Sequence, residues 1–392
     1  MSLALRSACL APLVTALLAS TALAWSTKEH IQLTRIAAAR LIADPQTPAA
    51  MKDWLREATP GLLDMDAERI WFMEQRQGIV PRGADGIPYW AVMPDTTNLM
   101  DGGAQSKKKV APFGVSEWYL HFIDLELFLT GDQPRAYRHD LSGKPKLDDI
   151  PRDMKDPRYV QAGMLPFRVE ESYRQLVDQL RGGRLNDKPG QLPRDEHAAK
   201  WAGYLAHYVQ DNTQPQHATV DYKAATYFAD KRRSPNVHAQ VEYMQADDDQ
   251  ADNMPVREEY WPLLVKALDE VADPVETDDP WQATVEVALR SYDALPLIGV
   301  AAQAAAKQRG TPENPEGPHA DTFDTEVFYR HRGPYLGREM SVMEMKAIQQ
   351  AWAVRRVQRV WRQAWEEANT AAPVPATGPT TLPSPSPTSR LP

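Results

Sequence analysis

Residues 204–218, YLAHYVQDNTQPQHA, place His207, Asp211 and His217 within eleven residues of an apolar-rich helical pattern. Residues four positions apart lie on one face of a helix, so His207 and Asp211 can close on a single metal ion. Proline lacks the backbone N–H and clashes with the preceding turn, so Pro215 should end the helix. The segment therefore predicts a helix followed by a turn that brings His217 back toward the same side.

Helical periodicity continues through most of the chain, and strand-like alternation is nearly absent. We predict an all-α, multi-helix fold with long loops, which Pro, Gly and Asp mark at residues 78–115, 132–158 and 310–334. Loops of this length are uncommon in compact domains unless they are functional or disordered. The predicted helices are 30–42, 169–180, 198–211, 237–245, 258–272, 281–308 and 340–369.

The composition is that of a globular protein of 392 residues, 43% hydrophobic and 25% charged. A net charge of -9 argues against a broad basic surface for phosphate backbones. It leaves a phosphodiester substrate open, because bound metal ions supply positive charge that the sequence count does not include. We expect a core at residues 25–250, a helical extension at 251–370 packed on it, and a disordered Pro/Ser/Thr-rich tail at 371–392.

Residues 1–24 read as a secretory signal peptide, with Arg6 before an apolar stretch and small residues Ala22 and Ala24 at the expected cleavage site. The apolar stretch is too short for a convincing membrane span. We therefore expect an exported, periplasmic or extracellular protein without a transmembrane segment. Its only cysteine, Cys9, would be removed, so the mature protein would have no disulfide, and a structural metal is one alternative source of stability.

Two further segments contain candidate metal ligands. His238 and Glu242 repeat the four-residue spacing in NVHAQVEYM, and His121 lies in the aromatic, apolar segment EWYLHFIDLE, where an unpaired imidazole would be costly. A histidine with an acid four residues later is usually a surface or core pair when it stands alone. In combination, nitrogen and carboxylate ligands without cysteine suit zinc.

Removal of the signal peptide would add another ligand. Cleavage after residue 24 would make Trp25 the N-terminal residue, five positions before His30. A free α-amine can bind a metal ion once it is deprotonated, a step that the metal promotes.

The order of Trp25, His30, a loop carboxylate, His121, HYVQDNTQPQH and HAQVE resembles the zinc-dependent phospholipase C and single-strand-specific nuclease superfamily. Its members are mainly helical enzymes with three zinc ions in a cleft. The match includes the QP shortly before the last histidine of the central motif. The resemblance covers residues 25–242, and the chain beyond about residue 250 is only loosely supported by it.

The resemblance implies a specific set of ligands for each of the three zinc ions, with Asp211 bridging two of the ions. These ligands are Trp25 (amine and carbonyl), His30 and Asp211 for the first ion, His121, His207, Asp211 and a loop carboxylate for the second, and His217, His238 and Glu242 for the third.

For the loop carboxylate we choose Asp95, because its context in WAVMPDTTN resembles the corresponding family segment. Asp85 and Asp64 are rival candidates. Asp95 lies farther from His121 than is usual in the family, and an insertion such as GGAQSKKK accounts for the difference.

The chemistry that the resemblance implies is hydrolysis of a phosphodiester by zinc-activated water. Asp95 would be catalytic as well, by orienting the water or accepting its proton. Phe122 and Asp124 occupy positions where nucleases of this type stack and hydrogen-bond a base. Phospholipases have a similar aromatic residue there, and a packed Phe with a capping Asp is the structural alternative.

Two substrate classes compete, phospholipid and single-stranded nucleic acid. The spacing of Trp25 and His30 resembles the nuclease branch, whereas Glu242 as the last ligand and the HA of His217–Ala218 resemble the phospholipase branch. The glycine-rich segment that nucleases carry between the last two zinc histidines is absent. We therefore favour a phospholipase C-like enzyme, with a nuclease or nucleotidase as the alternative and an exported helical binding module with structural zinc as a third reading.

The basic runs at residues 107–109 and 231–233 could meet an anionic membrane surface or nucleic acid, but we favour solvated loop charge as the explanation of each.

Overall fold

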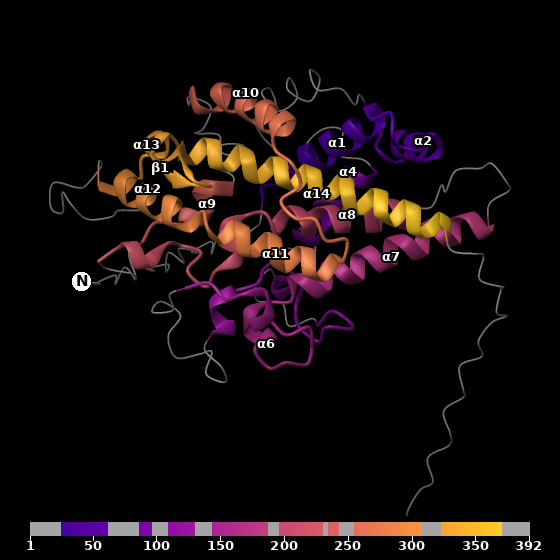
Figure 1. Ribbon diagram of the computed structural model, residues 1–392, viewed down its shortest axis with the longest axis horizontal. Helices are drawn as coiled ribbons and strands as arrows, with labels where there is room; N and C mark the ends of the chain where they lie inside the picture. Colours follow the sequence, from indigo (N-terminus) through magenta and orange to yellow (C-terminus); the bar gives the residue numbers. More distant parts are fainter. Residues whose placement is uncertain are drawn as a thin grey trace, which may run out of the picture.

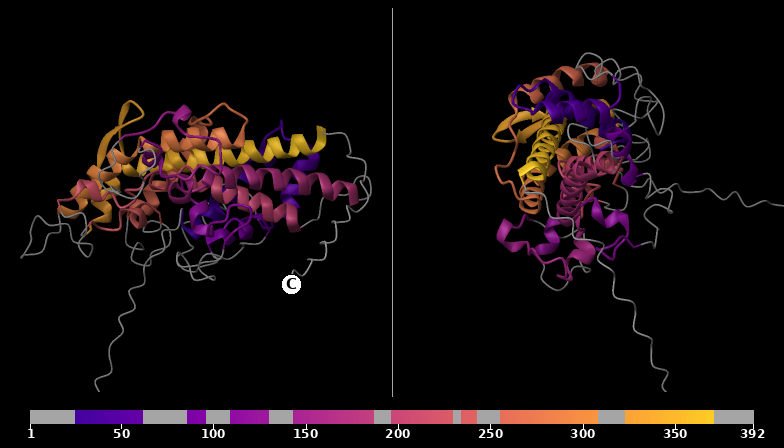
Figure 2. Two further views of the ribbon diagram at one scale, coloured as in Figure 1. Left: turned by 90° about the horizontal axis from the view of Figure 1, so that it is seen from below. Right: turned by 90° about the vertical axis from the view of Figure 1, so that its right-hand side faces the viewer.

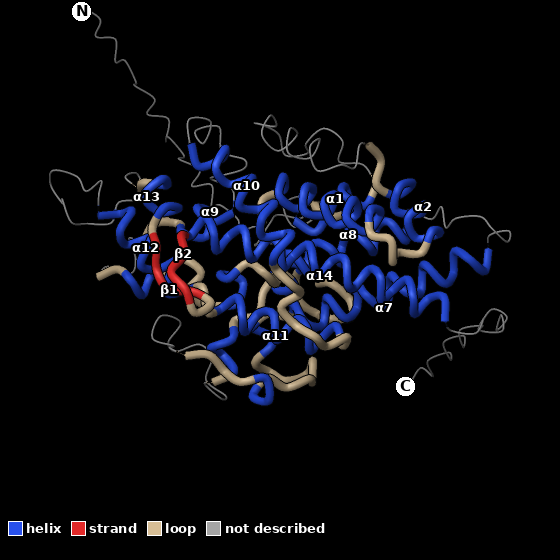
Figure 3. The backbone as a smooth tube through the Cα atoms, turned by 45° about the horizontal axis from the view of Figure 1, so that its top comes forward, coloured by secondary structure: helices blue, strands red, loops and turns tan. Residues whose placement is uncertain are grey.

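The computed structural model describes residues 25–61, 86–95, 109–129, 143–186, 196–229, 234–242, 255–307 and 323–370. These residues are mainly helical, with one two-stranded sheet, so the all-α prediction is confirmed (Figure 3). The predicted signal peptide and tail, the rival carboxylates Asp64 and Asp85, and all of the basic runs except Lys109 lie outside the described residues.

The N-terminal helices begin with α1, whose first turn is capped in both directions. The Ser26 hydroxyl accepts a hydrogen bond from the Glu29 N–H, and the Glu29 carboxylate accepts one from the Ser26 N–H. This capping box satisfies two amides that the helix itself cannot pair. The helices of this region are α1 (Thr27–Ala43), α2 (Ala49–Ala58) and α4 (Ile87–Trp90); α4 lies within a segment predicted to be a loop.

In the middle of the chain, two long helices pack against each other and short helical turns connect them to the rest. The long helix α8 ends at Asp211 and a 3-10 turn begins at Pro215, as the sequence predicts. The α-helices of this region are α6 (Tyr159–Ala162), α7 (Leu165–Asn186), α8 (Glu196–Asp211) and α9 (Val237–Glu242). The 3-10 helices are η2 (Glu117–Leu120), η3 (Leu125–Phe128), η4 (Leu147–Asp149), η5 (Pro215–Ala218) and η6 (Ala225–Tyr227).

The C-terminal part corrects one predicted helix. Residues 281–308 form two helices instead of one, with a break at Asp293 and Ala294. Pro296 explains the break, because proline is tolerated only in the first turn of a helix. The helices of this part are α10 (Pro255–Glu270), α11 (Pro280–Tyr292), α12 (Leu295–Lys307), α13 (Thr325–Arg330) and α14 (Val342–Thr370).

A β-hairpin precedes α14 and was not predicted. Strands β1 (Arg332–Tyr335) and β2 (Arg338–Ser341) pair antiparallel, and the two residues between them, Leu336 and Gly337, both have positive φ. Such a turn matches the twist of the flanking strands. The predicted loop at 310–334 is therefore wrong at residues 325–334, where α13 and most of β1 lie. The helix predicted to begin at residue 340 begins at Val342, directly after β2.

The long helix α14 is the centre of the packing. It runs along the length of the molecule beside α7 and also contacts α1, α8 and α10 (Figures 1 and 2). One hydrophobic cluster contains residues from both sides of position 250, for example Trp54 of α2 stacked on Trp365 of α14 with centroids 5.7 Å apart. The division into core and extension stays a prediction. Within the described chain, no helix combines the length and apolar character needed to cross a bilayer.

Candidate metal centre

In the described part of the chain, three groups of buried side chains bring their potential ligand atoms within 4.8 Å of one another, close enough to hold metal ions. Two of the groups share His207. We refer to the groups as the first, second and third clusters. The first contains His30, His207 and Asp211, the second Asp95, His121 and His207, and the third His217, His238 and Glu242.

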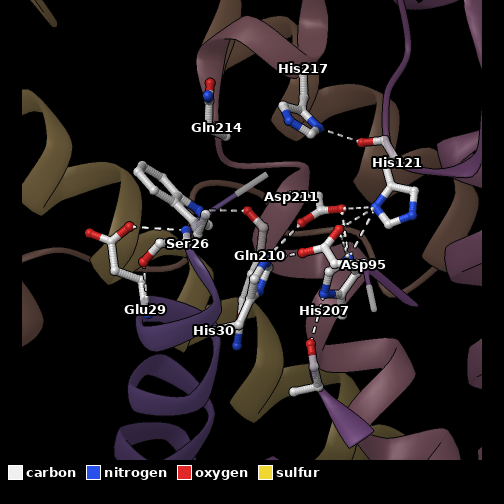
Figure 4. A network of polar contacts seen from close by, with 12 residues as sticks. Ser26, Glu29, His30, Asp95, His121, His207, Gln210, Asp211, Gln214 and His217 are labelled. Atoms are coloured by element: carbon white, nitrogen blue, oxygen red, sulfur yellow. Dashed lines mark hydrogen bonds and ion pairs between the residues drawn. The ribbon is translucent and has the colours of Figure 1, made fainter. Parts of the chain in front are cut away.

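Asp211, in the last turn of α8, faces three histidines from different segments (Figure 4). Its Oδ1 lies 3.3 Å from Nε2 of His30, in the first turn of α1. Its Oδ2 lies 3.2 Å from Nε2 of His207 and 2.9 Å from Nδ1 of His121, the residue that directly follows η2. The two carboxylate oxygens thus point to different histidines, the arrangement required of a bridging carboxylate.

Asp95 lies beside the same histidines, shortly after α4 in the chain. Its Oδ1 is 3.6 Å from Nδ1 of His121 and 3.7 Å from Nε2 of His207, and its Oδ2 is 3.9 Å from Nε2 of His30. The structure therefore brings the loop carboxylate chosen from the sequence into the second cluster. Its role as a ligand and catalytic group stays a prediction.

Three histidines are oriented by hydrogen bonds at Nδ1, so that Nε2 faces a cluster. The acceptor is the side-chain oxygen of Gln210 for His30, at 2.6 Å, and the carbonyl of Ala91 for His207, at 2.7 Å. For His217 it is the carbonyl of His121, at 2.6 Å. Partners of this kind fix the tautomer and the ring orientation of metal-binding histidines.

The third cluster lies where η5 meets α9. Nε2 of His217 is 3.4 Å from Oε1 of Glu242, and His238 contacts the same oxygen from one helical turn earlier. Gln214 donates a hydrogen bond to Oε1 of Glu242, at 3.1 Å. The turn at Pro215 thus directs His217 toward α9 rather than toward Asp211.

Several buried polar atoms of the clusters make no hydrogen bond within the described part of the chain. Leaving such atoms unpaired costs free energy comparable to their full desolvation. The donor set of imidazole nitrogens and carboxylate oxygens fits zinc, which would satisfy these atoms. The atoms of this kind that face the first and second clusters are Nε2 of His30, Oδ2 of Asp95 and Oδ1 of Asp211.

Burial shifts the pKa values of the ligand groups toward their neutral forms. It lowers the pKa of His30 and His121 well below 6.5, with a further contribution from His207. It also raises the pKa of Asp95 to about 7 and that of Asp211 well above its usual value. The imidazoles are therefore uncharged and available as ligands, and metal ions would compete with protons for the carboxylates.

A cavity of about 270 Å³ opens beside the clusters. His121, His217 and His238 line it together with Phe122 and Asp124, the two residues predicted to contact substrate. Sequence reasoning missed the aromatic side chains of Trp118 and Tyr222 and the carboxamides of Gln161 and Gln216, which line the same cavity. Aromatic and amide residues give no pattern that separates a pocket lining from core packing.

Trp25 is buried, and its indole N–H donates to the carbonyl of Gln210, at 2.9 Å, and to the hydroxyl of Thr213, at 3.3 Å. This anchors the start of α1 to the end of α8. Coordination through the amine and carbonyl of Trp25 stays a prediction.

No family model matches this sequence, and no curated protein matches it. The candidate centre therefore rests on its own geometry.

Proposed function

We propose that the chain is an exported zinc-dependent phosphodiester hydrolase, most similar in chemistry to phospholipase C. The observation that carries the proposal is the position of Asp211, whose two oxygens lie 2.9 to 3.3 Å from three histidines of the first and second clusters. Carboxylates that bridge two closely spaced metal ions are typical of hydrolytic two-metal sites.

We infer that the residues of the three clusters, together with Trp25, hold three ions. Trp25, His30 and Asp211 would hold one, His121, His207, Asp211 and Asp95 the second, and His217, His238 and Glu242 the third. Bound zinc would supply Lewis acidity, a lowered pKa for water and positive charge opposite phosphate oxygens.

The protein's own groups hold and orient the reactants. Asp95 carries a buried oxygen without a hydrogen-bond partner among the described residues and has a pKa of about 7, both suited to orienting water and accepting its proton. The cavity presents Phe122 and Trp118, whose rings meet edge-on at 6.0 Å, to the organic part of the substrate. Because candidate ligands line this cavity, substrate can reach the clusters, which favours catalytic over closed structural zinc.

A single-strand-specific nuclease or nucleotidase remains the second candidate. The aromatic surface of Phe122 and Trp118 favours it, because bases stack on such rings. Glu242 as the last ligand favours the phospholipase.

The test is a parallel assay of zinc-loaded protein beginning at Trp25, on phosphatidylcholine vesicles and on single-stranded DNA, each with and without a chelator. We expect chelator-sensitive release of phosphocholine. Cleavage of DNA alone would replace the phospholipase by the nuclease. Zinc binding without turnover on either substrate would argue for structural zinc.

A further inference from the structure

A buried lysine of the C-terminal helix α14 lies between the start of α1 and the third cluster. The Lys346 side chain is fully buried, and its Nζ lies 2.6 Å from Oε1 of Glu29. Removing one partner of such a pair leaves an isolated buried charge, whereas apolar replacement of both is often neutral or stabilising. The pair is therefore weakly explained by stability alone, and its contacts suggest another role.

On one side, the pair fixes the beginning of the chain's first helix. The second oxygen of Glu29, Oε2, accepts the Ser26 N–H at 3.3 Å, and the Ser26 carbonyl accepts the His30 N–H at 2.9 Å. The ammonium group also lies 5.5 Å from the centre of the Trp25 ring. Lys346 thus contacts the turn that carries two predicted ligands of the first ion.

On the other side, Lys346 holds the end of α9. Its Nζ donates to the carbonyl of Val241, at 2.7 Å, and to that of Glu242, at 3.3 Å. Carbonyls at the C-terminus of a helix have no partner within the helix, and a cation there is favourable. Because α9 has only six residues, it is not stable alone, and the position of Glu242 depends on such outside contacts.

The hydroxyl of Tyr329, on α13, supports the same end of α9. It donates to the carbonyl of Gln240, at 2.5 Å, and approaches that of Val241, at 3.3 Å. The rings of Tyr329 and Tyr260 each lie 5.8 Å from the Lys346 ammonium and help to shield it from water. Two C-terminal helices, α13 and α14, thus contact the backbone behind Glu242, and α10 shields the Lys346 ammonium through Tyr260.

We propose that Lys346 is a positioning residue that sets Glu242 of the third cluster against the start of α1, so that the third ligand set is complete only when α14 is docked. The proposal deepens the proposed function and rests on the third cluster binding zinc. It assigns a role to the C-terminal helices, which the resemblance to known enzymes does not cover.

The test is zinc affinity, measured by competition with a chromophoric chelator on the full chain. The variants are K346M and the double variant E29Q/K346M, which removes both charges and should fold even if K346M does not. We expect the double variant to bind its third zinc ion roughly 10- to 100-fold more weakly than the wild type, the usual effect of losing an outer partner of a metal ligand.

Two controls separate this role from a general loss of stability. D273N/R356M removes another ion pair of α14, in which Arg356 lies 2.9 Å from Asp273, and should leave all zinc affinities unchanged. In H238A the third site is already impaired, so adding E29Q/K346M to this variant should cause no further loss of zinc affinity.

The outcomes distinguish the inference from the proposed function. Equal zinc content in H238A and the wild type would overturn the third site and the inference with it. Three tightly bound ions in both the wild type and E29Q/K346M would overturn the inference alone. Equal weakening in the Arg356 control would also overturn it, because any disturbance of α14 would then suffice.

Discussion

At the scale of single residues, the spacing in the sequence identified the groups that meet but not what holds them. His207 and Asp211, four positions apart, do lie together at the end of α8, and His238 and Glu242 repeat the arrangement in α9. The orienting partners Gln210 and Gln214 lie within residues 204–218, the segment that contains His207, Asp211 and His217. A carboxamide, however, has no spacing or composition that distinguishes an orienting role from a solvated one.

His217 belongs to the third cluster alone, so its replacement tests the separation of the clusters. We expect H217A to lose about one zinc ion per chain and most of the turnover, because one of three ligands of that ion is removed. Metal analysis after dialysis measures the loss. H197A, at an exposed position on α8, is the matched control. Full zinc content and full activity in H217A would show that the assignment is wrong.

Gln210 orients His30 through the 2.6 Å hydrogen bond to Nδ1. In Q210L the imidazole loses this acceptor and its fixed tautomer, so we expect zinc affinity to fall roughly 10- to 100-fold while the helical content is kept. Competition titration and circular dichroism give the two values. Q303L, which removes a carboxamide that binds the Tyr227 carbonyl, should keep the wild-type affinity.

Glu126, in η3, gives a pH-dependent stability that is separate from the metal ligands. Burial raises its pKa above 4.5 although Thr219, Val220 and Tyr292 donate hydrogen bonds to its carboxylate. Between the unfolded and folded pKa values the native state therefore holds a proton that the unfolded state has released. Its contribution to stability is present below pH 4.5 and is lost as the pH rises through the folded pKa.

We therefore expect the free energy of unfolding of E126Q, relative to the wild type, to increase as the pH rises from about 4.5 through the folded pKa of Glu126. Urea denaturation across this range measures it. Parallel pH profiles of the two proteins would contradict the predicted shift.

At the scale of elements, periodicity located the long helices because each must bury a stripe of apolar residues. Periodicity gave the wrong prediction where a single proline interrupts an apolar run and where a strand is only four residues long. Pro296 divides the apolar run of 281–308 into α11 and α12, and four-residue strands are too short to show alternation. The turn at Leu336 and Gly337 could not be predicted from the sequence either, because the positive φ of both residues is known only from the backbone geometry.

Gly203 permits the close approach of α8 and α4, the helix that precedes Asp95. A Cβ at this position would lie 2.5 Å from Cβ of Trp90 and 2.6 Å from the carbonyl of Ile87. We expect G203A to destabilise the fold by about 1–3 kcal/mol, as overpacking does, and to weaken zinc binding by moving Asp95 and the Ala91 carbonyl away from His207. Urea denaturation and zinc titration measure the two effects.

Gly182 of α7 provides the control, since among the described residues a Cβ there would meet no atom within 4 Å beyond its chain neighbours and the backbone of its own helix. G182A should be neutral or stabilising by up to about 1 kcal/mol, because alanine loses less conformational freedom on folding. Equal stability of G203A and G182A would show that the contact between α4 and α8 tolerates a methyl group.

At the scale of the whole molecule, the candidate centre gathers candidate ligands from five separate segments, and the sequence motifs identified these ligands but not the packing that brings the segments together. The contacts of Lys346 that connect α14 to α1 and α9 join residues far apart in the sequence. No local sequence pattern predicts such pairs. Lys346 would have been expected on a solvated face, since lysine is rarely fully buried.

Metal removal should reveal how much of the fold depends on the clusters. Much of the apolar core is formed by α2, α7, α11 and α14, which carry none of the clustered His, Asp and Glu residues, so a chelator should abolish turnover and lower the melting temperature while largely preserving helicity. The lowered melting temperature follows from loss of ligand binding to the native state, and re-addition of zinc should restore it in a concentration-dependent way. Collapse of the far-ultraviolet circular dichroism signal on chelation would instead identify zinc as essential for folding.

The position of α14 at the end of the described chain has a consequence for biosynthesis. Among the described helices α14 is synthesised last, so the apolar faces of α1, α7, α8 and α10 that it contacts stay uncovered until residues 342–370 have left the ribosome. Such exposed surface favours aggregation of unfinished chains. A ribosome that stops before residue 342 would release a product that contains every predicted zinc ligand but lacks the helix against which they are assembled.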